Sequence, residues 1–232
     1  MSGMGEMTMP GGWTMSMMGM RMPGQTWPGA AASFLGMWVM MTVAMMLPSL
    51  VPMLWRYRQA VARTGVASGP RLVWLTTLVA TGYFFVWTAV GAAVLLIGVA
   101  LSAILLREPT LARTVPVVNA GAVLIAGVLQ FTKWKARRIA CWSDASVLGR
   151  APATDTGSAW RHGLRLGSQC VHACVGLMAI SLLMGMMDFR VMAVVAAAIV
   201  AERFAPSGAR IARAIGVVII AAGLFLVVRA AA

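Results

Sequence analysis

Three cysteines have the residue type and spacing in this chain that best suit metal chemistry. Cys170 and Cys174 are four residues apart, so on a helix they share one face. Cys141 lies in a polar stretch between two apolar runs, from which it could approach that face. Three thiolates suit a soft ion such as Cu(I) or Zn(II). Buried free cysteines also act as small apolar packing residues, so the spacing leaves both roles open.

Methionines form the second set of candidate ligands. Nine of the 20 methionines lie within residues 1–30, where no packed core needs them. Thioethers are soft ligands that suit Cu(I) better than Zn(II), and the glycines among them leave the segment flexible. The candidate ligands are Met4, Met7, Met9, Met15, Met17, Met18, Met20 and Met22. Adhesion to a membrane surface or simple compositional bias is the alternative reading.

The remaining side chains carry no recognisable catalytic set. The sequence has no Ser-His-Asp candidates, no glycine-rich phosphate loop, no HExxH motif and no paired carboxylates. His172 lies on roughly the opposite side of a helix from the cysteine pair, so we expect it to hydrogen-bond to another helix. We therefore expect a protein that is not an enzyme.

The composition indicates a membrane protein. The chain is 60% hydrophobic and only 11% charged, whereas about a quarter of the residues are charged in a soluble domain. Its net charge of +13 comes from basic residues in short loops between apolar runs. That distribution is typical of membrane topology rather than of nucleic-acid binding. The expected partner is the lipid bilayer, and no nucleic acid is expected.

Six apolar runs, of which the last contains Arg213, predict an all-α, polytopic transmembrane helical bundle with six spans. We expect Pro48 and Pro52 to kink the first span, residues 98–113 to form an outer loop or surface helix, and residues 1–30 to be mostly irregular. The fifth run is short and becomes a span only if charged residues lie at both interfaces. The predicted spans are residues 31–55, 72–97, 114–132, 167–187, 191–201 and 211–228.

The basic residues orient this map. With six spans, 14 of the 19 lysines and arginines fall in loops on one side of the membrane. The positive-inside rule makes that side cytoplasmic and places both termini outside. The prediction is thus an extracytoplasmic Met/Gly-rich segment, residues 1–30, followed by a membrane domain, residues 31–232, with a cytoplasmic loop at 133–166.

Several short motifs resemble a bacterial family of unknown function described as predicted metal-binding integral membrane proteins. The resemblance covers roughly residues 35–228 and implies a helical fold in the bacterial inner membrane with a metal site, but no reaction. The matching pieces are MWVMMTVAMMLPS (37–49), GYFFVW (82–87), AGVLQFTKWKARRIAC (126–141), CVHACVGLM (170–178), GMM (185–187) and AERFAPSG (201–208).

The chain also departs from the family pattern at positions that bear on the metal site. Asp144 and Ala145 stand where the family usually has a His-Cys pair. Leu166 and Ala173 stand where it usually has a histidine and a further cysteine. Cys141, Cys170 and Cys174 are the site residues that remain, with Cu(I) as the candidate ion.

Two functions stay open at this level. The first is soft-metal, specifically copper, binding or handling at the outer surface. The second is a non-catalytic accessory or structural subunit of a larger membrane protein complex. Small-residue faces such as Gly91–Ala93 and Ala196–Ala198 would hold such a subunit against its partners.

Overall fold

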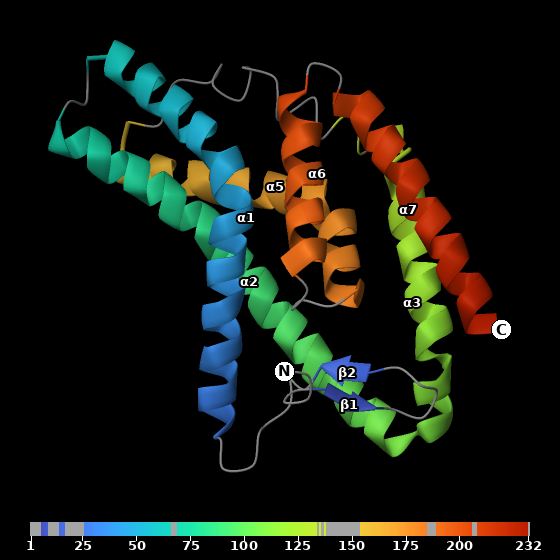
Figure 1. The fold of residues 1–232 in the computed structure, drawn as a ribbon. Coiled ribbons are helices and arrows are strands. Elements are labelled where there is room, and N and C mark those ends of the chain that lie inside the picture. The colour runs from blue at the N-terminus through green and yellow to red at the C-terminus, as the bar shows by residue number, and fades with distance from the viewer. Residues whose placement is uncertain are drawn as a thin grey trace.

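The computed structural model describes residues 6–8, 14–16, 26–65, 69–133, 135, 137, 154–184, 189–205 and 208–231. Over these residues the protein is built of six helices and one short antiparallel hairpin (Figure 1). The elements are β1 (Glu6–Thr8), β2 (Thr14–Ser16), α1 (Trp27–Arg63), α2 (Pro70–Arg107), α3 (Pro109–Leu129), α5 (Thr156–Met184), α6 (Phe189–Phe204) and α7 (Gly208–Ala231).

The all-α prediction is confirmed, but the number of spans is corrected from six to four. Four helices, α1, α2, α5 and α7, are long and apolar enough to cross a membrane, which suggests a membrane protein. In α3 the apolar part is limited to Thr114–Leu129, and α6 has only 16 residues. A helix needs about 20 apolar residues to cross a hydrocarbon core of about 30 Å, so both fall short.

One expectation near the predicted loops was wrong. Residues 98–113 are not a separate loop or surface helix, because α2 continues unbroken for 38 residues to Arg107. No proline or charge interrupts the run before Arg107, and Pro109 then begins the next helix. In the N-terminal segment β1 and β2 pair, and the expectation that residues 1–30 are mostly irregular stays a prediction, because most of them lie outside the described residues. Three-residue strands are too short for their alternation to be recognised in the sequence.

Helix α1 is bent, and a buried side-chain hydrogen bond joins it to α2. Helix α1 begins at Trp27, where the Thr26 hydroxyl accepts a hydrogen bond from Gly29 N. Pro48 and Pro52 lie inside it, and α1 bends along its length (Figure 1). The indole Nε1 of buried Trp38 donates to Trp87 O at 2.9 Å, which ties α1 to α2.

Helices α2 and α5 cross so closely that side chains are excluded at the contact. A Cβ added to Gly167 would lie 2.9 Å from Tyr83 O and 3.0 Å from Val86 Cβ, and one added to Gly163 would strike Val79 O. Small residues one turn apart allow helix backbones to approach in this way. The crossing sets the register that brings Tyr83 against the middle of α5.

The start of α5 is fixed by a side-chain cap. One Asp155 carboxylate oxygen accepts from Ser158 N at 2.9 Å, and the other accepts from the Ser158 hydroxyl. The hydrogen bond from that hydroxyl, followed by the one from the backbone N–H, holds the pKa of the Asp155 carboxyl below its usual range. The cap therefore stays ionised at neutral pH, where it also favours the helix dipole.

The other helices complete the bundle around α5. Helices α3 and α7 lie side by side (Figure 1), with Gly127, Gly216 and Gly223 at their contact. Helix α6 packs against α5, α7 and α1. The C-terminal end of α6 thereby reaches the buried middle of α5, although it is remote from it in sequence.

The close α2–α5 crossing predicts an asymmetric response to adding one methyl group. Gly167→Ala is expected to lower the free energy of unfolding by about 1–3 kcal/mol, because the new Cβ overlaps backbone and Val86 atoms. Gly98→Ala is the matched control, since a Cβ there meets nothing within 4 Å. That change should be neutral or stabilising by up to about 1 kcal/mol. Unfolding midpoints in detergent micelles measure both, and equal midpoints would contradict the crossing.

Candidate functional site

The cysteine pair of α5 lies at the centre of the molecule. Cys170 and Cys174 are buried, with 0% and 1% of their surface exposed. A single nitrogen, Nη2 of the partly buried Arg203 on α6, donates to Cys170 Sγ at 2.8 Å and to Cys174 Sγ at 3.0 Å. The two sulfurs therefore face one point. A guanidinium is the counter-charge that a buried thiolate needs, and the thiolate is the form of cysteine that binds metals.

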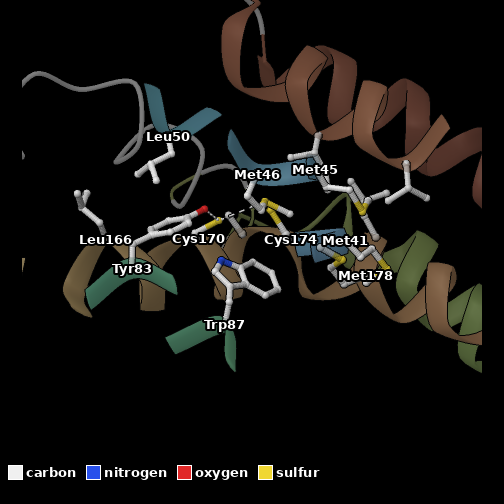
Figure 2. Packing of buried hydrophobic residues seen from close by; sticks show 14 of the residues in the cluster. Met41, Met45, Met46, Leu50, Tyr83, Trp87, Leu166, Cys170, Cys174 and Met178 are labelled. Carbon is white, nitrogen blue, oxygen red and sulfur yellow. Dashed lines mark hydrogen bonds between the residues drawn. The ribbon is translucent and has the colours of Figure 1, made fainter. Parts of the chain in front are cut away.

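Cys170 has two further polar neighbours from other helices (Figure 2). Its Sγ lies 2.9 Å from the Tyr83 hydroxyl of α2 and 3.8 Å from Met46 Sδ of α1. Sulfurs bound to one ion at about 2.3 Å can be no more than about 4.6 Å apart. The Met46 thioether is therefore close enough to Cys170 to share an ion with it.

More methionines surround the pair. Figure 2 shows Met41, Met45 and Met178 gathered beyond Cys174, on the side away from Tyr83. All three belong to the buried core. Methionine fills irregular gaps in a core well, so burial alone does not make these residues ligands. These three buried methionines do surround the cysteines with further sulfur atoms that are shielded from water.

A buried ion pair lies next to the cysteine pair. Lys135 Nζ lies 2.9 Å from Glu202 Oε2, and each side chain is only 5% exposed. The same Nζ donates to Ala173 O, which lies between the two cysteines in α5. The pair thus joins the end of the α3 region to α5 and α6. Because Glu202 precedes Arg203, it also fixes the part of α6 that carries the guanidinium.

The predicted ligands separate into those the structure brings together and those it does not describe. Cys170 and Cys174 converge on Arg203 as stated. Met7 and Met15 lie opposite each other in the hairpin register. His172 is on the exposed side of α5, and its Nδ1 lies 2.6 Å from Ser168 O in the same helix. Cys141, Met4, Met9, Met17, Met18, Met20 and Met22 lie outside the described residues.

Five residues of this site were missed by the sequence reasoning. Arg203 and Lys135 are among the 14 basic residues that the sequence assigns to cytoplasmic loops, and Glu202 is one of the charged residues that the short fifth run needs at its interfaces. Tyr83 and Met46 were assigned to spans without a role. The available signal was weak: the acidic and basic residues of AERF stand at the end of an apolar run, and GYFFVW contains one of only two tyrosines. Neither pattern indicates which residues these side chains contact.

The small-residue faces proposed for partner binding are used inside the molecule. A Cβ on Gly91 would strike the buried indole of Trp38. Ala196 and Ala198 are partly buried against the hydrophobic core. Gly91, Ala196 and Ala198 accommodate neighbouring helices of the same chain, whereas Ala93 and Ala197 are exposed, so docking of another subunit on these faces stays a prediction.

Acidic and imidazole ligands do not contribute to a metal site in the described part of the chain. No group of three or more His, Cys, Asp or Glu side chains able to hold an ion occurs there. Among the described residues the cysteine pair is thus joined by no third ligand of these types, and the printed sulfur neighbour is Met46. The arrangement that remains is two thiols and one thioether.

The fold and this site define a class: a helical protein with four candidate membrane spans that carries a buried thiol pair beside thioethers. The sequence model of the PpoB2 family, described as copper chaperone, matches residues 35–226. The match covers most of the chain, and the protein belongs to the PpoB2 copper chaperone family. Membership suggests copper binding. No curated protein and no solved structure matches the chain.

The buried ion pair predicts a strong dependence of stability on both partners. Lys135→Met is expected to lower the free energy of unfolding by about 3–5 kcal/mol, because it leaves the Glu202 carboxylate buried and uncompensated. Combining it with Glu202→Leu should recover much of that loss, since both charges are then gone. Denaturant titrations of the two single variants and the double variant give the coupling free energy. Strictly additive losses would show that the pair does not interact.

Proposed function

We propose that this protein is a membrane copper chaperone that holds Cu(I) between Cys170, Cys174 and Met46 and passes it on without chemical conversion. The observation that carries the proposal is the convergence of the two thiols and one thioether inside the bundle, with a guanidinium against both thiols. Membership of a copper chaperone family supports the same ion.

The ligand chemistry favours Cu(I) over harder ions. Thiolates and thioethers are soft ligands, whereas carboxylates and carbonyls suit Mg²⁺, Ca²⁺ and Mn²⁺. The buried carboxylate of Glu202, near the pair, is engaged by Lys135. Met46 is completely buried, so water does not compete with its thioether for the ion. A site of this kind exchanges its ion by ligand substitution, which suits a carrier rather than an enzyme.

The orientation follows from the first loop. Residues 56–71 comprise the end of α1, the short connection and the start of α2, and they contain four arginines and no acid. The positive-inside rule makes a short loop of this kind cytoplasmic, so the N-terminal segment lies outside the bacterial inner membrane. Four spans, an even number, return the C-terminus to the same side, and they place the basic stretch 133–165 there as well, so this orientation rests on the first connection alone. This orientation is the one that gives the methionine-rich segment access to extracytoplasmic copper.

We propose that residues 1–25 collect Cu(I) at the outer surface for the core site. Thioethers resist the disulfide formation that would disable thiols in an oxidising compartment. The hairpin register sets Met7 opposite Met15 along the backbone.

The core site predicts a specific loss of copper. Purified full-length protein, loaded anaerobically with chelator-buffered Cu(I), should hold one tightly bound ion that Cys170→Ser or Cys174→Ser removes. Met46→Leu should weaken binding about tenfold or more, because it deletes a ligand while keeping the volume. Met53→Leu, a change in the same helix, is the matched control. Metal content and the thiolate-to-copper absorption measure the outcome.

Two results would overturn this proposal. Metal-free protein that co-purifies with fixed partners would favour the accessory-subunit function. Copper that survives both cysteine substitutions would place the ion elsewhere. Cys141→Ser tests which residue is the third ligand. If Met46 is the third ligand, this variant still binds one copper ion per protein. If the variant binds less copper, the Cys141 thiol is the third ligand.

The N-terminal segment predicts a second, weaker copper component. Replacing the eight methionines from Met4 to Met22 by leucine should abolish this component and leave the core site intact, because leucine keeps the apolar volume without sulfur. The component should be present in right-side-out vesicles and absent from inside-out vesicles when Cu(I) is supplied externally. Identical titrations for the two tails would mean that the methionines serve membrane contact instead.

A further inference from the structure

The charges around the cysteine pair suggest how the site chooses its ion. Three ionic side chains of the described residues meet there: Lys135, Glu202 and Arg203. Their formal charges sum to one positive charge. Lys135 and Glu202 are each 4% exposed, so water screens this excess weakly. The complex of the two thiolates with their ion is therefore most stable when it carries one negative charge, because the dielectric constant at this buried position is low.

We propose that Arg203 is the selectivity-determining residue of this site, admitting a monovalent soft ion and rejecting divalent ones. The inference rests on the proposed function. Two thiolates holding Cu(I) carry one negative charge, which the cluster neutralises. Two thiolates holding Zn(II) or Cd(II) carry none, and the excess positive charge then stays buried without compensation.

The contact geometry gives this role to Arg203 rather than to Lys135. Arg203 Nη2 touches both sulfurs at 2.8 and 3.0 Å, whereas Lys135 Nζ contacts Glu202 and a backbone carbonyl. Ligand sulfurs commonly accept hydrogen bonds from outer groups that tune the metal. The guanidinium can therefore keep its N–H contacts while the sulfurs hold the ion. It positions and balances the ligands without binding the metal itself.

The test measures ion preference rather than binding alone. Full-length protein is titrated with Cu(I) and with Zn(II) under chelator buffering, and the ratio of the two affinities is compared between variants. Arg203→Gln should reduce the preference for Cu(I) at least about tenfold, because it removes the unit charge that opposes a divalent ion. Arg203→Lys keeps the charge and should retain the preference. Arg213→Gln is the matched control at an exposed arginine of α7.

Glu202→Gln tests the same inference with the opposite sign. It raises the excess positive charge by one unit while leaving an oxygen for Lys135, so the preference for Cu(I) should increase. Monodisperse elution and unchanged helicity show which variants fold. One folded variant, Arg203→Gln or Glu202→Gln, is enough to test whether the charge sets the ion preference. A folded Arg203→Gln or Glu202→Gln variant with an unchanged affinity ratio would overturn the inference. Wild-type copper binding that does not depend on Cys170 and Cys174 would instead refute the proposed function.

Discussion

A charged side chain in an apolar interior must meet a partner, and this requirement shapes the centre of the protein. Burying an unpaired ion costs several kcal/mol, so Arg203 is found where two sulfurs accept its N–H groups. Lys135 and Glu202 satisfy the same requirement for each other. Because these residues come from the α3 region and α6 and meet at α5, their pairing fixes three segments relative to one another. The thiol pair lies at the point where they join.

The glycine crossing and the charge cluster act together on Cys170. Gly163 and Gly167 let α5 approach α2 at backbone distance, which brings the Tyr83 hydroxyl to the sulfur. Helix α1 is held to α2 by the Trp38 indole, and it supplies Met46 from the other side. The environment of one sulfur atom thus depends on four helices. A shift of any of them would change what that sulfur contacts.

This construction suits a carrier that must hold a reactive ion away from water and still release it. The ligands proposed are soft and few, and they sit among buried methionines that could accommodate small displacements. The surrounding charges are fixed by salt-bridge and hydrogen-bond partners rather than by solvent. In the proposed function, such a site would recognise the charge of its ion as well as its softness.

Local properties of the sequence determined much of this protein by themselves. The lack of charge over long apolar runs predicts helices of membrane length, because each residue contributes directly to burial in lipid. The four-residue spacing of Cys170 and Cys174 places them on one helix face, since helical periodicity is fixed. The number of spans was less secure, because α3 and α6 fall near the length limit where composition alone is a weak guide.

Only the tertiary structure decided which groups surround the thiols. Met46 is 124 residues from Cys170 along the chain, and Tyr83 is 87 residues away. Contacts over such separations depend on crossing positions and helix rotation, which no local pattern encodes. The same holds for Arg203: its sequence position at the end of an apolar run is typical of an interfacial charge. Packing of α6 against α5 instead carried it inward, because the two sulfurs and the neighbouring ion pair gave it partners there.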